Sequence, residues 1–511
     1  MTITADTSPD GFPLWSLRED VHVEADQAGD VVILHSRWGD EVVRRPGRAV
    51  VEALHRMSLG PVSLENAVGD PADRPALDRV LGRLRHLVIR SLGLDQERPV
   101  ISVVPLTPRA RFGPVAPRPG RAVRMSRFAV LRAVDGVYHL ESPLSLHRVV
   151  LHRPEALWCL AKLSRPLTPA AAAAAMPCPA APAMDMLAYL IGAGMLVQAR
   201  PGETGGPPVF AEDTDPALVT WPPEDLMFHT RSTLGRHDHD FGATYPMGER
   251  WTVEPVTKPA AREGESVPLY RPRWETLMAS DPPLTAAVEG RRPTRRFGAG
   301  AVTADELGEL LYRTARVRSL LASPGEPGEV TSDRPYPSFA ASYELELYLA
   351  VDRCAGLRPG VYHYDPSGHR LDPVPAAQAD VQELLDRGRM SADLTTPPPV
   401  LMFVTARFRR VTWKFTGPGY ALVLRNTGAL LQTLYLVAAT LELATRPLAT
   451  ADIDVTARAL GTDWRTESCV GGLALGRPAD GPGRVERRRR PVNDPGWPEL
   501  AAELLRRRRT R

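Results

Sequence analysis

The sequence contains very little lysine. Of its 63 basic residues only Lys162, Lys258 and Lys414 are lysines, and the other 60 are arginines. Arginine is always protonated, whereas a partly buried lysine can lose its proton. Chance would explain one lysine at an arbitrary loop position. Because Lys414 lies between an apolar strand and a helix expected to be buried, we interpret it as a titratable amine.

Other features are also missing. The four cysteines lie far apart and form no CxxC pair, which argues against a disulfide framework or a cysteine-based zinc site. The sequence has no GxGxxG and no Walker loop, so a Rossmann or P-loop nucleotide site is not expected. The net charge of +3 is small and implies no polyanionic partner. A polar N-terminus without a signal peptide or membrane-spanning run predicts a cytoplasmic protein.

The N-terminal part of the chain contains a repeated order of predicted strands and helices. Arg45-Pro46 and Arg153-Pro154 are separated by 108 residues, and each pair lies between a predicted hairpin and a helix. In the first copy we expect strands at 31–34 and 41–44 and helices at 48–58 and 77–90; in the second, strands at 137–140 and 149–151 and helices at 155–164 and 184–197. Residues 169–182 are expected to be a loop or a poor helix. Each copy is interpreted as a winged-helix-like module.

Winged helices often bind DNA, but the second copy argues against it. Its last helix, at 184–197, has no basic residue to contact phosphates. The arginines of the corresponding helix in the first copy are compatible with a solvated face. An exposed hairpin edge suits the capture of an extended peptide by strand addition, and we expect peptide rather than nucleic acid.

Residues 201–283 are rich in proline, glycine and charge and are expected to act as a linker with some ordered structure. His229, His237 and His239, with Asp238 and Asp240, suggest a metal site. Their spacing is not that of a structural zinc site, so no metal is predicted.

The stretch 400–448 organises the C-terminal part. It begins as an apolar strand, turns at Gly417-Pro418-Gly419 and continues as a helix from about Tyr420 to Ala444. This helix is apolar on nearly every face and is expected to be buried. Arg425, Asn426 and Gln432 interrupt it too early for a membrane span.

The remaining predicted elements around this stretch are helices and strands that do not follow a repeated βαβ order. Thr303 and Glu306 form a predicted capping box, and residues 344–351 alternate as a strand. The predicted fold class is therefore α+β. Arginine clusters at 291–296, at Arg334 and at Arg425 offer donors suited to phosphate, although the first is equally compatible with an exposed basic turn.

Several ordered motifs resemble one family, the SagB/ThcOx-type dehydrogenases of the nitroreductase superfamily. These motifs occupy residues 228–242, 291–297, 334–351, 356–371, 406–443 and 470–478. The resemblance implies an FMN enzyme that oxidises thiazolines or oxazolines of a ribosomally made precursor peptide to azoles. It also implies an α+β homodimer with FMN at the interface, winged-helix peptide-recognition modules, and a cyclodehydratase partner.

The resemblance also implies roles for individual residues. The expected cofactor-binding residues are Arg291, Arg292, Arg295, Ser338, Arg425 and Arg477. Lys414 corresponds to the lysine of the family's Lys-Tyr pair, where it would act as a proton acceptor or polarise the ring nitrogen of the substrate.

The sequence departs from the family pattern at several positions. Phe415 replaces the tyrosine of the pair, and Pro293 replaces a serine and removes a backbone N–H. Ala340, Ala449 and Ala451 stand where glycines are usual near the flavin. These departures support an alternative, in which the chain is a degenerate subunit that binds a precursor peptide or a partner enzyme without oxidising it.

The expected organisation has five parts. They are a winged-helix-like peptide-binding module at 1–105, a second such module at 106–200, a linker and pre-catalytic segment at 201–285, a nitroreductase-like FMN domain at 286–480 and a basic C-terminal tail at 481–511.

Overall fold

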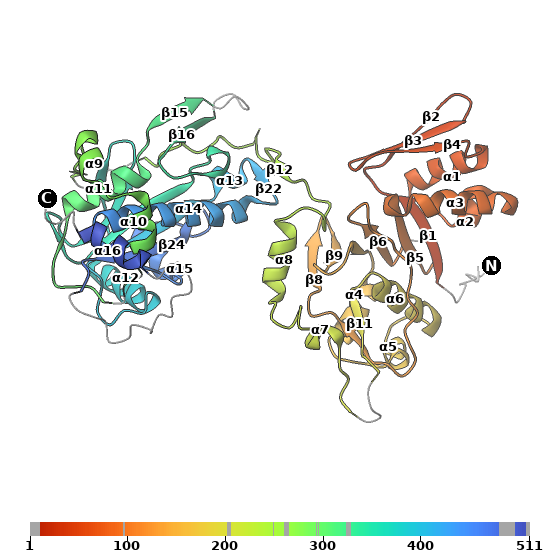
Figure 1. Cartoon of the computed structure of the whole chain (residues 1–511). Helices are drawn as coiled ribbons and strands as arrows, with labels where there is room; N and C mark the ends of the chain where they lie inside the picture. The colour runs from red at the N-terminus through yellow and green to blue at the C-terminus, as the bar shows by residue number, and fades with distance from the viewer. Residues whose placement is uncertain are drawn as a thin grey trace. The chain divides into compact units, whose positions relative to one another are not determined.

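The computed structural model describes residues 11–95, 98–201, 206–248, 250–259, 265–292, 294, 296–322, 329–479 and 496–506. The chain forms two compact units, Met1–His239 and Asp240–Arg511 (Figure 1). The five-part division expected from the sequence is finer than this and stays a prediction.

The duplicated order of elements is present in the N-terminal unit. The first copy comprises β1 (Phe12–Leu17), β2 (His22–Ala25), β3 (Val31–Ser36), β4 (Gly39–Arg44), α1 (Arg48–Leu59), α2 (Leu64–Val68), α3 (Arg74–Arg83) and β5 (Val88–Gly93). The second comprises β7 (Val123–Met125), β8 (Val130–Val134), β9 (Val137–Glu141), β10 (His147–Leu151), α4 (Pro154–Lys162), α5 (Pro169–Ala174), α6 (Ala180–Gly192) and β11 (Leu196–Gln198).

Details of hydrogen bonding repeat as well. Trp15 and Val62 exchange backbone hydrogen bonds of 2.9 Å, and Val123 and Leu167 do so at 2.7 and 3.0 Å. Ser63 caps α2, and Thr168 caps α5 in the same way. The repeat is therefore structural, while the winged-helix interpretation of each copy stays a prediction.

The helix predicted at 77–90 was too long. It ends at Arg83, and residues 88–93 form β5, which pairs with both β1 and β6 (Ile101–Pro105). Likewise, the helix predicted at 184–197 ends at Gly192 and is followed by β11. Apolar residues at helical spacing continue past both helix ends, but strand pairing decides their conformation.

The two copies differ at one strand edge. With the offset of 108 residues, β4 of the first copy corresponds to β10 of the second. The strand β10 pairs with β9 on one side and with β6 on the other, antiparallel in both cases. Six strands thus form one sheet in the order β1-β5-β6-β10-β9-β8. The strands β2-β3-β4 form a separate sheet, in which the outer edge of β4 has no strand partner among the described residues.

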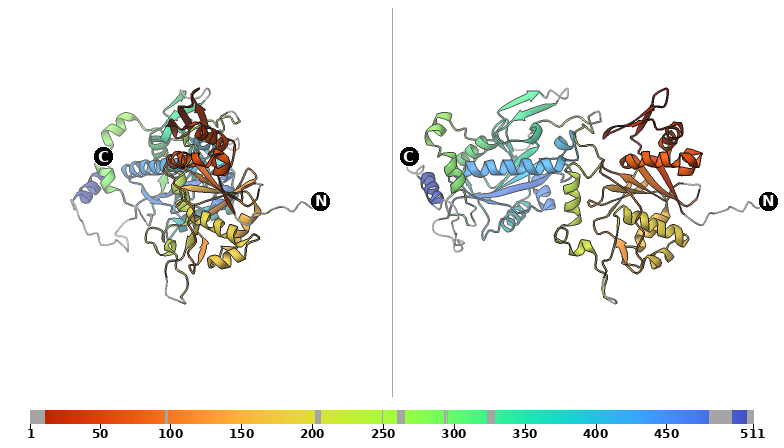
Figure 2. Two further views of the ribbon diagram at one scale, coloured as in Figure 1. Left: turned by 90° about the vertical axis from the view of Figure 1, so that its right-hand side faces the viewer. Right: turned by 45° about the vertical axis from the view of Figure 1, so that its right-hand side comes forward.

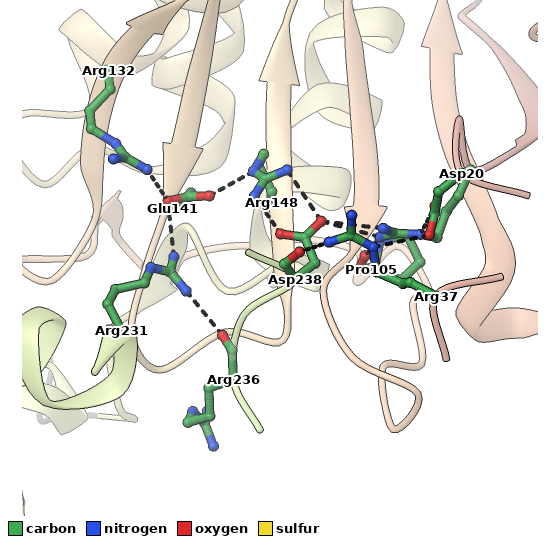
Figure 3. A network of polar contacts seen from close by, with 10 residues as sticks. Asp20, Arg37, Pro105, Arg132, Glu141, Arg148, Arg231, Arg236 and Asp238 are labelled. Carbon is green, nitrogen blue, oxygen red and sulfur yellow. Dashed lines mark hydrogen bonds and ion pairs between the residues drawn. The ribbon is translucent and has the colours of Figure 1, made fainter. Parts of the chain in front are cut away.

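A buried ion-pair network connects β8, β9 and β10 to α8 (Pro223–Arg231) (Figure 3). Glu141 is 1% exposed and accepts from Arg132 at 2.6 Å, from Arg148 at 2.6 Å and from Arg231 at 2.9 Å. Arg148 also contacts Asp238 at 2.7 Å. The segment that leaves α8 is thereby fixed to the second copy.

The same segment is fixed to the first copy. The Asp238 carboxylate lies 3.3 Å from the guanidinium of Arg18, and the Asp238 carbonyl accepts a hydrogen bond from Arg37 in the β3–β4 turn. Asp238 therefore joins both copies in one polar network (Figure 3).

The C-terminal unit has a seven-stranded antiparallel sheet between two layers of helices. Its strand order is β13-β20-β19-β17-β21-β24-β23. The strands are β13 (Val267–Pro268), β17 (Leu345–Val351), β19 (Gly360–Asp365), β20 (Arg370–Val374), β21 (Val400–Arg407), β23 (Ala444–Pro447) and β24 (Glu467–Gly476). One face packs on α11 (Ala304–Ala315) and α14 (Gly419–Thr440), the other on α12 (Gln378–Ser391) and α15 (Ile453–Leu460).

Both faces of the central strands are covered, so β17 and β21 are buried along their whole length. The predicted alternation in β17 does not separate buried from exposed side chains. It divides buried side chains between the two layers, with Leu345, Leu347 and Leu349 on one side and Tyr348 and Ala350 on the other. The Thr303–Glu306 capping box at the start of α11 is confirmed, as is the α+β fold class.

The helix α14 runs along the sheet and ends at Thr440, four residues before the predicted end (Figures 1 and 2). Its length and its mean hydropathy of 1.2 would also allow it to cross a membrane, but 50% of that window is buried inside the protein. Leu422, Leu430 and Leu434 belong to the core beneath the sheet. These contacts are those of a core helix.

The end of the chain contains a helix that the sequence did not predict. Residues Trp497–Arg506 form α16, which packs on α10 (Leu284–Gly290). A Cβ at Gly290 would lie 2.4 Å from Leu505, so the glycine permits the close approach of the two helices. Most of the basic C-terminal tail expected at 481–511, including the arginines at 487–490, lies outside the described residues.

Candidate functional site

Asn426, in the first half of α14, holds the loop that contains Ser338. Its side-chain amide donates to Ser338 Oγ at 3.1 Å and to Glu344 at 3.0 Å, and its oxygen accepts from the backbone N–H of Phe339 at 2.9 Å. Glu344 is fully buried, and burial raises its pKa. A buried side chain with all these partners satisfied fixes the loop relative to the helix.

The backbone of this loop is strained. Ala340, Ala341 and Tyr343 have φ values of 54°, 52° and 41°, in the left-handed region that disfavours residues with a Cβ. Such conformations persist only where the surroundings impose them, and they are frequent at ligand sites. A glycine would adopt this backbone freely at position 340, whereas Ala449 and Ala451 have no positive φ and need no glycine for that reason.

Lys414 lies close to the same end of α14, between α13 (Arg409–Thr412) and β22 (Phe415–Thr416). Its ammonium contacts the two carboxylate oxygens of Glu329 at 3.1 and 3.2 Å. The ring of Phe415 lies 6.2 Å from that of Phe339, which places Lys414 beside the Ser338 loop. The lysine selected by composition is thus ion-paired, which the sequence did not predict.

Arg291 lies near the opposite end of α14. Its guanidinium carbon lies 5.4 Å from the ring centre of Tyr435, and among the described residues its buried Nε has no hydrogen-bond partner. Burial raises the pKa of Tyr435 to about 12, against the nearby Arg291 and Arg446, so its phenol stays neutral. A buried donor without an acceptor is costly, and an anionic group would satisfy it.

Thr294 and Gly298, which follow Arg292 in the sequence, contact β23 and the residue that follows β24. Thr294 N donates to Thr445 O at 3.0 Å, and Gly298 N donates to Arg477 O at 2.9 Å. Arg291 and Arg477 therefore flank one short segment. The Arg477 guanidinium also contacts Glu306 at 2.5 Å.

The other predicted cofactor residues differ in position. Arg425 is exposed on the outer side of α14 and directly precedes Asn426, so this helix is not buried on every face, contrary to the expectation from the sequence. Arg295 and Pro293 lie outside the described residues. The expected set thus forms two groups, Ser338, Lys414 and Arg425 near one end of α14 and Arg291, Arg292 and Arg477 toward the other.

The two groups are well separated. At 1.5 Å of rise per residue, Asn426 and Tyr435 are roughly 13 Å apart along the helix axis. A ligand that contacts both groups must be elongated, with an anionic end at Arg291 and its other end at the Ser338 loop.

Sequence reasoning missed three residues of this site. Asn426 was noted only as a polar interruption of an apolar helix, and Glu344 only as the start of a strand. Glu329 follows a glycine- and proline-rich stretch that gives no sign of its contact with Lys414, 85 residues away. His237 and His239 stack at 5.8 Å, and no group of metal-binding side chains is found within the described part of the chain.

Two families match parts of the chain. Residues 123–238 match the cyanobactin oxidase ThcOx family, and residues 288–477 match the nitroreductase family. The first match ends at Asp238 of the N-terminal network, and the second covers both groups of site residues.

Individual proteins match over shorter lengths. The protein MJ1384 of Methanocaldococcus jannaschii, whose name classes it with the nitroreductases, is 28% identical over 185 residues, which is 36% of this chain and 83% of that protein. The microcin B17-processing protein McbC of Escherichia coli is 32% identical over 147 residues, or 28% of this chain. The match spans 52% of McbC, about half its length.

Among solved structures, the E. coli microcin synthetase McbBCD complex with truncated pro-MccB17 bound contains a similar chain. The identity is 21%, the TM-score is 0.31, and the match covers 51% of this chain and 95% of that one. The family assignment rests instead on the two family matches and on the sequence identity with MJ1384 and McbC. Together these similarities support a nitroreductase-like protein of the SagB/ThcOx type.

Proposed function

We propose that the chain is an FMN-dependent oxidoreductase that converts thiazolines or oxazolines in a ribosomally made peptide to thiazoles or oxazoles. The observation that carries this proposal is the arrangement of two groups of residues along α14. FMN is elongated, with a phosphate at one end and a flat ring system at the other, and so has the shape that the two groups require.

The phosphate would bind at Arg291, Arg292 and Arg477. The buried Nε of Arg291 is a donor that requires an acceptor, and guanidinium groups bind phosphate through paired hydrogen bonds. The flavin ring would lie against the Ser338 loop, which Asn426 and Glu344 hold in place. These residues fit an anionic, elongated cofactor.

The chemistry that FMN supplies when bound is acceptance of a hydride. The chain's own residues bind and orient the substrate and handle the proton that also leaves the ring. Lys414 lies beside the Ser338 loop and would donate a hydrogen bond to a ring nitrogen of the substrate.

The absorbance spectrum of the purified chain tests this proposal. A flavin band, or its appearance on adding FMN at micromolar concentration, is expected. Arg291→Ala should weaken FMN binding at least tenfold, because it removes the buried donor. The control Arg465→Ala changes an exposed arginine (72% of its side chain) whose guanidinium contacts Asp463, and this variant should bind FMN normally.

A colourless protein that fails to bind added FMN would contradict the proposal that the chain is an enzyme. It would favour the second candidate, a non-catalytic subunit that binds the precursor peptide or a partner enzyme. The replacement of the family's tyrosine by Phe415 is the observation that supports this alternative, because a phenol is then absent next to Lys414.

The precursor peptide would bind at the outer edge of β4. In the second copy β6 covers the equivalent edge of β10, antiparallel, from Ile101 to Pro105. An added peptide strand would give β4 the neighbour that β10 already has. Arg83 donates to Val42 O at 3.2 Å and caps this edge, so an incoming strand would displace its guanidinium.

Hydrogen exchange with and without the leader peptide of the cognate precursor tests this assignment. Amides of β4 should gain protection, whereas those of β10 should not change. Peptide binding should persist at raised salt, whereas contacts with phosphates weaken steeply with salt. Salt-sensitive binding of random duplex DNA, with no affinity for the leader, would contradict it.

The remaining parts of the proposal concern assembly. We expect a cytoplasmic homodimer that works beside a cyclodehydratase, which would form the azoline rings that this chain oxidises. Tyr420 and Leu424 on the outer side of α14 are 48% and 40% exposed and provide an apolar surface for the second copy.

A further inference from the structure

Lys414 is held by a carboxylate that is distant in sequence and nearly buried. The side chains of Lys414 and Glu329 are 12% and 6% exposed. The Nζ atom lies at 3.1 and 3.2 Å from the two oxygens of Glu329, so it is shared between them. Glu329 is the residue before β16 (Val330–Asp333), which forms a hairpin with β15 (Ser319–Ala322). Because Val330 pairs with Ala322, the ion pair joins the loop end of this hairpin to the segment that leads into α14.

The other groups around Lys414 are also arranged for a cation. The ring of Tyr245 lies 5.5 Å from Nζ, and the ring of Phe415 lies 6.0 Å away. Tyr245 N donates to Lys414 O at 3.1 Å, which fixes the lysine backbone beside this ring. A carboxylate and two aromatic faces all stabilise a positive charge at Nζ.

The second cation in this region has partners of its own. Arg410, in α13, donates to the carbonyl of Ser342 at 2.9 Å and to that of Glu254 at 2.5 Å. Burial, together with Arg407 and Arg334, lowers the pKa of Arg410 to about 10, although the carboxylates of Glu346 and Glu329 act in the opposite direction. Arg410 contacts carbonyl groups, whereas the Glu329 carboxylate contacts Lys414.

We propose that Glu329 is a positioning residue that keeps Lys414 protonated, so that Lys414 acts on the substrate as a cationic hydrogen-bond donor and not as a proton acceptor, and the proton that leaves the ring passes to solvent water. A neutral amine at Lys414 would leave the Glu329 carboxylate nearly buried without its direct ion-pair partner, and only the carbonyl-bound Arg410 would remain as a nearby cation, which is unfavourable. This assignment rests on the proposed function for the role of Lys414, but the charge of Lys414 can be measured without turnover.

The low lysine content makes this measurement direct. Reductive methylation of the full chain with 13C-formaldehyde labels Lys162, Lys258 and Lys414 together with the N-terminus, so NMR would show few signals. Loss of one signal in Lys414→Arg would assign it. We expect the Lys414 signal of the unmodified chain to be that of a protonated amine at neutral pH, because both oxygens of Glu329 contact it. A Lys414 signal that titrates near neutral pH in the unmodified sequence would overturn the proposal.

Replacement of Glu329 tests its part in the effect. In Glu329→Gln the Lys414 signal should titrate at least one pH unit lower, because the carboxylate is gone. In Glu329→Asp, which retains the charge, the Lys414 signal should behave as in the unmodified chain, and this variant decides the question if Glu329→Gln does not fold. If the titration midpoint of the Lys414 signal is the same with glutamate, glutamine and aspartate at position 329, the proposal is contradicted.

The chain offers a matched control in its other buried Lys–Glu contact. Lys258 donates to Glu467 at 2.6 Å and to the Tyr348 hydroxyl at 2.6 Å. Glu467→Gln should shift the Lys258 signal and leave that of Lys414 in place. A shift of both signals would show a general loss of structure and would count against a specific role for Glu329.

Turnover provides a second readout. If Lys414 is a cationic donor, Glu329→Gln should move the alkaline limb of the rate profile to lower pH, and Lys414→Arg should retain measurable oxidation. If Lys414 is instead a proton acceptor, Lys414→Arg should abolish oxidation, and Glu329→Gln should increase the activity at neutral pH. If the unmodified chain oxidises no azoline, the proposed function fails, while the NMR titrations still decide the charge of Lys414.

Discussion

At the scale of single residues, the candidate site combines strain with satisfied polar contacts. Three residues of the loop after Ser338 have left-handed backbones, and Asn426 holds this loop through three hydrogen bonds. The contacts of Asn426 and Glu344 compensate for the strain, because both buried side chains would otherwise lack partners. The loop geometry therefore depends on α14.

Ala340→Gly should stabilise the protein by about 1 kcal/mol, because glycine adopts the φ of 54° without steric cost. The urea midpoint of the full chain, at an unchanged m value, measures this effect. Ala457→Gly, in the middle of α15, is the control and should cost about 1 kcal/mol. A loss of stability in Ala340→Gly would contradict the strain argument.

The sequence identifies some of these residues and not others, for physical reasons. Lys414 stands out because lysine is scarce, and Arg291 and Ser338 because they lie in motifs. Asn426 and Glu329 give no such signal, because their partners are more than 80 residues away in the chain. Their importance arises only when the chain folds.

At the scale of elements, the repeat was recognisable from sequence because an Arg-Pro pair precedes the first helix of each copy. The joining of strands β1, β5 and β6 with β8, β9 and β10 into one sheet was not, since pairing between copies leaves no local pattern. The helix ends at Arg83 and Gly192 were missed for the same reason, because strand pairing after each helix overrides helical spacing.

The network around Glu141 predicts a specific dependence of stability on pH. Burial opposes ionisation of Glu141, yet Arg231, Arg148 and Arg132 lower its pKa from 4.5 to about 2. A carboxylate whose pKa is lower in the folded protein stabilises it above the unfolded pKa. The contribution, about 3 kcal/mol, should be complete above pH 4.5 and fade as the pH falls toward 2.

Glu141→Gln tests this prediction. The variant should be less stable than the unmodified chain at pH 7, and the difference between them should shrink as the pH falls from 4.5 to 3. Urea denaturation at several pH values measures it. Glu52→Gln, which removes an exposed carboxylate from a surface ion pair, should change stability by less than about 1 kcal/mol at any pH. A difference for Glu141→Gln that does not vary with pH would show that its carboxylate is not ionised by the network.

At the scale of the whole molecule, α14 serves three purposes. Its inner side completes the core beneath the seven-stranded sheet, and its length separates the two groups of candidate cofactor residues. Its outer side exposes Tyr420 and Leu424, although a helix this apolar normally buries such side chains. A second copy of the chain would cover them beside the Ser338 loop.

Leu424→Arg should therefore disrupt a dimer and weaken FMN binding together. The unmodified chain is expected to sediment at twice 55.9 kDa, and the variant at 55.9 kDa, because a charge on the apolar surface opposes its burial. Leu59→Arg is the matched control, since Leu59 is 89% exposed in the N-terminal unit, and it should leave the mass and the bound flavin unchanged. Analytical ultracentrifugation and the flavin absorbance of the same samples measure both effects. A Leu424→Arg variant that remains dimeric would place the interface elsewhere, and a monomer that binds FMN normally would show that one copy holds the cofactor alone.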